Sequence, residues 1–117
     1  MRHSKADKRL GRNDDHRRSM LRNLATSLFT HGKIETTIVR AKEVSRVASR
    51  IITRAKKGDL HSRRLVAAYL TSGDVVKKVF DVIAPSLAGR AGGYTRIVRT
   101  RIRKGDAAEM AQLELLK

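Results

Sequence analysis

The sequence predicts an α+β domain of two layers, in which a small mixed or antiparallel sheet of about three strands is covered by about four helices. Apolar residues recur at helical spacing through the middle of the chain, which predicts the helices. Segments at both ends of this helical block alternate in polarity and favour strands. Such strands can join into one sheet that carries the helices on one face. With 117 residues the chain is long enough for one domain and hardly for two.

The first residues, 1–13, are predicted to form a basic extension ahead of one domain over residues 14–117. The extension has a single large apolar side chain after Met1, Leu10, and cannot bury enough surface to offset the entropy lost on ordering. It is therefore expected to become ordered against a partner. Its candidate contact residues are Arg2, His3, Lys5, Lys8, Arg9 and Arg12.

A first helix is predicted over about residues 14–31. Six apolar residues at helical spacing support it: Met20, Leu21, Leu24, Ala25, Leu28 and Phe29. Asn13 or Asp14 suits the N-cap, and Gly32 suits the position just past the end. The polar face of this helix carries three arginines, Arg17, Arg18 and Arg22.

A short strand and a long helix are predicted next. In KIETTIV, residues 33–39, the side chains of Ile34, Thr36 and Ile38 alternate onto one face of a strand. From about residue 40 to Gly58 an apolar stripe follows at helical spacing: Ala41, Val44, Val47, Ala48, Ile51, Ile52 and Ala55. The opposite face of this helix is strongly basic.

Two short helices and a hairpin complete the prediction. Asp59 is expected to cap a helix over about residues 60–71, and Asp74 is expected to cap a helix that ends near Pro85. After the turn AGRAGG, strands are expected over about residues 94–103 and 109–116, joined by a loop with glycine at a turn position.

The charge of the chain points to a polyanionic partner. Lys and Arg number 27 against 11 Asp and Glu, which gives a formal net charge of +16. A nucleic-acid phosphate backbone is the densest polyanion in a cell. An anionic membrane surface is the other candidate, but the apolar stripe of residues 41–55 has no aromatic residue and is needed for a core.

The segment AGRAGGYTR, residues 88–96, is the sharpest local signal for a nucleic-acid partner. Gly92 and Gly93 leave backbone amides open to close approach by phosphate. Tyr94 offers either a ring on which a base can stack or a side chain for the core. The candidate contacts outside the extension are Arg17, Arg18, Arg22, Arg63, Arg64, Arg90, Gly92, Gly93, Tyr94, Thr95, Arg96 and Arg99.

Catalysis and metal binding find no support in the sequence. The chain has no Cys, and its four His are not spaced as a metal clamp. Asp14 and Asp15 are adjacent, so on a helix their side chains point about 100° apart and capping is the better interpretation. The glycines lack the spacing and the Lys of a nucleotide-binding loop. We therefore predict that the chain is not an enzyme and that it binds no cofactor, metal or small-molecule substrate.

The location is expected to be the cytoplasm. No apolar run approaches the length of a bilayer-spanning helix, and the basic N-terminus lacks the apolar segment of a secretory signal. The apolar stripes of the helices are used in the predicted core, so neither a membrane partner nor a stable homo-oligomer is expected.

Six motifs resemble those of a known family in their order and spacing. They are MRH, LGRNDDHR, THGKIETT, AKEV, GDLHSRRL and AGRAGGYTRIVR followed by GDAAEMAQLELL. Together they resemble the bacterial large-subunit ribosomal protein family number seventeen over essentially the whole chain. The resemblance implies a two-layer α/β fold and a structural role: binding to large-subunit ribosomal RNA near the polypeptide exit region, beside neighbouring large-subunit ribosomal proteins. That family often has small hydroxyl residues where this chain has Asp14 and Asp15.

Two classes of function follow from these observations. In the first, the chain is a structural RNA-binding protein of the large ribosomal subunit, and its cations hold several RNA segments together. The alternative is a DNA-binding nucleoid or regulatory protein, for which a recognition helix and usually a dimer seam are expected. Neither feature is evident in the sequence.

Overall fold

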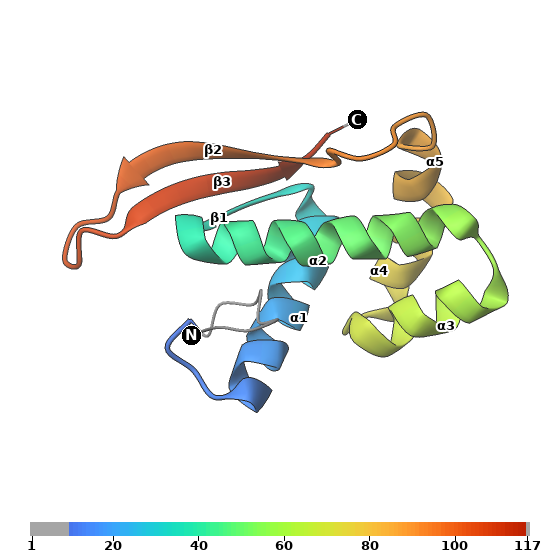
Figure 1. Ribbon diagram of the computed structural model, residues 1–117, viewed down its shortest axis with the longest axis horizontal. Helices are drawn as coiled ribbons and strands as arrows, with labels where there is room; N and C mark the ends of the chain where they lie inside the picture. Colours follow the sequence, from blue (N-terminus) through green and yellow to red (C-terminus); the bar gives the residue numbers. More distant parts are fainter. Residues whose placement is uncertain (1–9, 117) are drawn as a thin grey trace, which may run out of the picture.

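Helices and strands follow one another in the order that the sequence predicts. The computed structural model describes residues 10–116, and every statement about the fold concerns these residues. The elements are α1 (Asp14–His31), β1 (Lys33–Thr37), α2 (Ile38–Lys57), α3 (Leu60–Tyr69), α4 (Gly73–Lys78), the π-helical turn η1 (Val79–Ile83), α5 (Ala84–Ser86), β2 (Thr95–Ile102) and β3 (Glu109–Leu115) (Figure 1). The prediction of an α+β fold is confirmed.

The sheet has three antiparallel strands in the order β1-β3-β2, so the last strand of the chain lies in the centre. Its pairing places Ile34 of β1 and Ile97 of β2 on either side of Leu113 of β3. These side chains share one face of the sheet, and α2 runs across that face (Figure 1). The β2–β3 hairpin extends past the N-terminal end of α2, so its tip lies away from the helical layer.

The core lies between the sheet and the helices, with α2 at its centre. Nearly all of the predicted stripe of α2 is buried, and Val47 packs against the same core with partial exposure. On α1, Ala25, Leu28 and Phe29 are fully buried. Aliphatic side chains therefore supply most of the core, as expected for a chain with 3% aromatic residues.

The predicted helix signals are largely confirmed. The Asn13 side chain caps α1, since its oxygen accepts the backbone N–H of His16 at 2.8 Å. The Asp59 side chain caps α3 by accepting the N–H of Ser62 at 2.8 Å. Gly32 and Gly58 end α1 and α2 in the left-handed conformation, with φ of 81° and 70°.

Three predicted boundaries are wrong. Strand β1 ends at Thr37, and Ile38 belongs to α2, where it packs on the core one turn before Ala41. Helix α3 ends at Tyr69, before the predicted residue 71. Asp74 does not cap α4, because Ser72 occupies the N-cap position and Asp74 lies in the first turn.

The helix that is predicted to end near Pro85 ends at Ser86, as expected. The backbone is helical without a break from α4 through η1 to α5, and Pro85 lies inside α5. A proline ring clashes with the carbonyl four residues earlier in a regular α-helix. The wider π-helical turn lies directly before Pro85, and within it the Ala84 N–H donates to the Val79 carbonyl five residues back. This turn explains how the helix accommodates the proline.

Candidate nucleic-acid interface

The predicted arginines of α1 have different surroundings. Arg17 pairs with Asp14 at 3.0 Å on the first turn of the helix, whereas Arg18 is exposed. Arg22 donates to the carbonyl oxygens of Tyr69, at 2.7 Å, and Ala68, at 3.0 Å. These carbonyls end α3, so Arg22 acts as a cation at a helix C-terminus and joins α1 to α3.

Of the six predicted contact residues of the extension, Arg12 is the one that lies within the described residues. Arg12 is half-buried and donates to the Leu10 carbonyl at 2.9 Å. The other five lie outside the described residues: Arg2, His3, Lys5, Lys8 and Arg9. Their contacts stay a prediction.

Arg63 and Arg64 of α3 are both exposed. The guanidinium of Arg63 lies 5.0 Å from the centre of the Phe80 ring, within the range of a cation–π contact. Arg63 is thus positioned by the Phe80 ring, whereas Arg64 makes no cation–π contact with a ring among residues 10–116.

The turn AGRAGG, residues 88–93, precedes β2, and we call it the glycine loop. Lys56 near the end of α2 holds it in place. The Lys56 ammonium donates to the Tyr94 hydroxyl at 3.1 Å and to the Arg90 carbonyl, and it lies 5.1 Å from the centre of the Tyr94 ring. The hydrogen bond from Lys56 lowers the pKa of Tyr94 below its ordinary value. Gly93 has a φ of 61°, which favours glycine, and both Gly92 and Gly93 are exposed.

Tyr94 lies in the core. Only 4% of its surface is exposed, so its ring is not open for stacking on a base. Of the two interpretations of this side chain, the structure supports packing. Whether RNA reaches the loop through the exposed Gly92, Gly93 and Arg90 stays a prediction.

The basic side chains of the β2–β3 hairpin face acidic partners. Arg96 pairs with Glu114, Arg99 with Glu109 at 3.5 Å and Arg101 with Glu35 at 3.0 Å. Arg103 pairs with Asp106 in the hairpin loop, and this hydrogen bond lowers the pKa of Asp106 to about 2. The arginines of this hairpin stay exposed or half-buried, but part of their charge is balanced within the fold.

Thr95 at the start of β2 lies against α2. Its hydroxyl shares a hydrogen bond of 2.6 Å with the Ser45 hydroxyl, and the residue is half-buried. Thr95 therefore holds the strand on the helix, whatever else it contacts.

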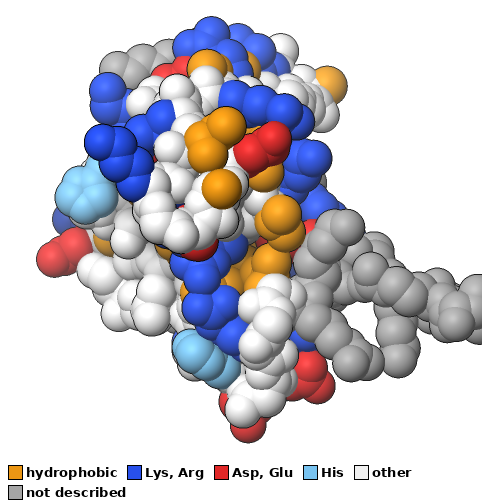
Figure 2. Space-filling model, turned by 90° about the vertical axis from the view of Figure 1, so that its left-hand side faces the viewer, with side chains coloured by type: hydrophobic (Ala, Val, Ile, Leu, Met, Phe, Trp, Pro, Cys, Tyr) orange, Lys and Arg blue, Asp and Glu red, His pale blue; other side chains and the backbone are white. Residues whose placement is uncertain are grey.

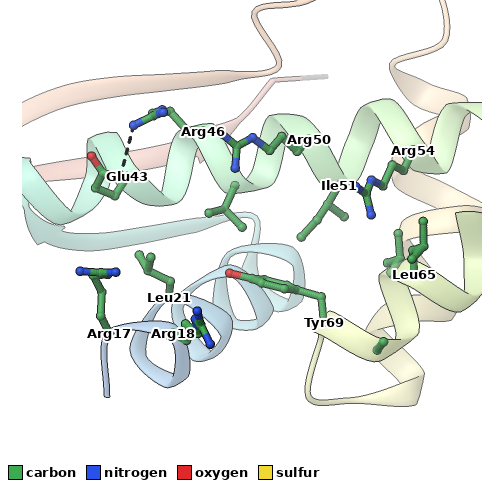
Figure 3. Close-up of a pocket in the computed structure, with 13 residues that line it drawn as sticks. Arg17, Arg18, Leu21, Glu43, Arg46, Arg50, Ile51, Arg54, Leu65 and Tyr69 are labelled. Carbon is green, nitrogen blue, oxygen red and sulfur yellow. Dashed lines mark ion pairs between the residues drawn. The ribbon is translucent and has the colours of Figure 1, made fainter. Parts of the chain in front are cut away.

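Three arginines that the sequence prediction left out of its candidate set lie together on α2. Arg46, Arg50 and Arg54 follow one another at one-turn spacing and line a hollow of about 470 Å³ together with Arg17 and Arg18 of α1 (Figure 3). We call this the arginine hollow. The spacing of 4 and 8 residues is visible in the sequence. The opposite wall is not, because it depends on how α1 packs against α2.

The cations therefore lie in several directions from the core. Figure 2 views the molecule from the end that holds the hairpin tip, where Lys and Arg side chains surround a few exposed apolar ones and outnumber the acidic ones. Within residues 10–116 no group of three or more His, Asp or Glu side chains is placed to hold a metal ion. No helix in that range is long and apolar enough to cross a membrane.

Comparisons with known proteins decide the family. The sequence model of the family described as "Ribosomal protein L17" matches residues 20–116. This chain belongs to the ribosomal protein L17 family. The chain is 52% identical over 117 residues to a protein of Pelobacter propionicus named "Large ribosomal subunit protein bL17", covering 100% of this chain and 92% of that one.

Other members of the L17 family are similarly close. A protein of the same name from Clostridium acetobutylicum is 55% identical over 109 residues, with 93% of this chain and 96% of the relative covered. One from Moorella thermoacetica is 55% identical over 111 residues, with 95% and 99% covered. The family predicted from the six motifs is thereby confirmed.

Proposed function

We propose that this chain is a structural constituent of the large ribosomal subunit in the cytoplasm, and that it acts without catalysis. The observation that carries the proposal is membership of the L17 family along nearly the whole chain, with relatives named as large-subunit proteins. Its partners are large-subunit ribosomal RNA and neighbouring ribosomal proteins. The net charge of +16 supports an RNA partner, because such charge repels itself unless an anion lies against it.

The finer part of the proposal concerns how the chain binds. Exposed cations lie on α1, on α3, in the glycine loop and on the hairpin, and these elements face different directions. A protein with cations on several sides can hold several RNA segments at once. The proposed contacts are those predicted from the sequence apart from Tyr94, whose ring is buried. Among them Arg64, Arg90 and Arg99 are exposed. From the family resemblance, we place the binding site near the polypeptide exit region.

The mode of binding can be tested with purified components. Labelled full-length chain is titrated with large-subunit ribosomal RNA and with duplex DNA at several salt concentrations. The proposal predicts tighter binding to the RNA at physiological salt. It also predicts that the logarithm of the affinity falls linearly with the logarithm of the salt concentration, with a slope proportional to the number of phosphates contacted. Equal affinity for duplex DNA would favour the DNA-binding alternative instead.

Variants then test the assigned residues. Arg90→Glu combined with Arg96→Glu is expected to weaken RNA binding at least tenfold, since each change removes a cation and adds an anion. The matched control is Lys77→Glu with Lys42→Glu, which changes the charge by the same amount at exposed positions of α4 and α2 outside the proposed contacts. If both pairs weaken binding equally, Arg90 and Arg96 have no special role.

A further inference from the structure

The arginine hollow combines two properties that a surface for a nucleic-acid duplex does not need together. Its rim is cationic, and its floor is apolar. Five arginines line the hollow: Arg46, Arg50 and Arg54 of α2, and Arg17 and Arg18 of α1. Glu43 of α2 is the acidic residue among the lining side chains, and Arg46 is turned toward it (Figure 3). The volume of about 470 Å³ lies within the range of sites that hold small ligands.

The positive charge of the rim is largely uncompensated. Two of the five arginines have acidic neighbours: Arg17 pairs with Asp14 at 3.0 Å and Arg46 with Glu43 at 3.5 Å. Within residues 10–116 no ion pair involves Arg18, Arg50 or Arg54. Like charges at four-residue spacing on a helix repel each other. An anion seated between them would relieve this repulsion.

The floor of the hollow is formed by side chains from all three helices. Leu21 of α1, Val47 of α2, and Leu65 and Tyr69 of α3 line it. All four are only partly covered by the fold, and Leu65 is 37% exposed. The ring of Tyr69 projects from the end of α3 into the space between α1 and α2 (Figure 3).

The position of Tyr69 is fixed by the fold. Arg22 holds the Tyr69 carbonyl at 2.7 Å, and the Arg22 guanidinium lies 5.8 Å from the centre of the Tyr69 ring. The aromatic edge of the hollow is therefore set by α1 before any ligand binds, which lowers the entropy lost on binding.

We propose that the arginine hollow binds an unpaired, unstacked nucleotide of the large-subunit ribosomal RNA. This inference rests on the proposed function. The base would lie on the apolar floor beside Leu65 and Tyr69, and the flanking phosphates would meet Arg18, Arg50 and Arg54. Proteins commonly bind single-stranded RNA in this way, with bases on apolar or aromatic side chains and arginines on the backbone.

A duplex fits the hollow less well. Its bases are stacked inside the helix, so a duplex backbone across the rim would leave the apolar floor in contact with water. Only a base taken out of the stack covers the floor and places its own phosphates at the rim. The proposal therefore predicts a preference between two forms of the same polymer, which a purely electrostatic surface does not show.

The test compares two RNA probes. Fluorescein-labelled single-stranded RNA of about twelve nucleotides and a duplex RNA of equal phosphate number are each titrated with the full chain. Leu65→Asn makes part of the floor polar without changing charge. It is expected to lower affinity for the single strand about tenfold and for the duplex less than about twofold. The control is Leu60→Asn, on the same helix but outside the hollow and 62% exposed, which should change neither affinity.

A second variant tests the rim. Arg50 is exposed, so Arg50→Gln should leave folding unchanged, as checked by circular dichroism. The proposal predicts a weaker salt dependence of single-strand binding, because the variant neutralises about one phosphate fewer. The control is Lys77→Gln on α4, which removes the same charge outside the hollow and should leave the salt dependence unchanged.

Three results would overturn the proposal: equal reductions of single-strand and duplex affinity in Leu65→Asn, no reduction in either, or binding of an oligo-glutamate peptide that depends on Leu65 and Arg50 while RNA binding does not. The last result would assign the hollow to an acidic protein segment.

Chemical probing of assembled large subunits separates this inference from the proposed function. If the chain is absent from large subunits, the proposed function fails and the inference with it. If the chain is present, subunits with Leu65→Asn should show an unpaired nucleotide that becomes more reactive than in subunits with the unchanged chain. Identical reactivity in both subunits would reject the hollow as a nucleotide site and leave the ribosomal role intact.

Discussion

Replacing Lys56 by Met should loosen the glycine loop from the end of α2. Met keeps an apolar stem of similar length but has no ammonium group. The change removes the hydrogen bond of 3.1 Å to the Tyr94 hydroxyl, the hydrogen bond to the Arg90 carbonyl and the cation–π interaction at 5.1 Å.

The size of the effect follows from these interactions. The bond to the Tyr94 hydroxyl should contribute about 1–1.5 kcal/mol, because Tyr94 is largely buried. The cation–π interaction adds about 0.5–1 kcal/mol. The Arg90 carbonyl belongs to an exposed residue and can turn to water, so removing its hydrogen bond should add little. Together the free energy of unfolding should fall by about 1.5–2.5 kcal/mol, and Tm by about 5–12 °C.

Urea unfolding followed by circular dichroism measures this change, and hydrogen exchange of the amides of residues 90–94 locates it. The matched control is Lys57→Met, which removes the same charge at the next, exposed position and should change stability by less than about 0.5 kcal/mol. If Lys56→Met is no less stable than Lys57→Met, Lys56 does not hold the loop and the reasoning is wrong.

Three further outcomes are expected. Asn13→Ala should cost about 1 kcal/mol of stability in urea unfolding, because the cap on the His16 N–H is removed, and an unchanged midpoint would contradict this. The pKa of Asp106 is lowered to about 2 from 3.8, so its stabilising pair with Arg103 is complete above about pH 4 and disappears as the pH falls through 2. Over that range the protection factors of the hairpin amides, taken relative to the intrinsic exchange rate at each pH, should fall, and Asp106→Asn should abolish this dependence. Finally, salt or polyphosphate should raise the Tm of the free chain by screening its charge of +16, whereas no gain from either would argue against self-repulsion.

Much of the fold could be predicted because its signals are local. Both ends of α1 and the C-terminal end of α2 follow from Asn13, Gly32 and Gly58, whose roles depend on the adjacent backbone. The strand prediction for Ile38 is wrong because a β-branched residue after an alternating run fits a strand and also the first turn of a helix. Packing against the core decides between them, and a local pattern does not contain that information.

The candidate interface was less predictable, because charge in a sequence does not reveal which cations are already paired. Arg96 and Glu114 are 18 residues apart and meet only through the register of β2 on β3. Arg22 is 47 residues from the carbonyl of Tyr69 that it binds. The arginine hollow likewise requires α1 and α2 to face each other, so its α2 wall is visible as a repeat in the sequence while its depth and its floor are not.

The most direct test of the central claim is to locate the chain in ribosomal subunits. Subunits from the source cells are separated on a sucrose gradient, washed in moderate salt and analysed by quantitative mass spectrometry. We expect close to one copy of this chain per large subunit and almost none in the small subunit. Absence from the large subunit, with the chain recovered in the nucleoid or free fraction, would contradict the ribosomal assignment.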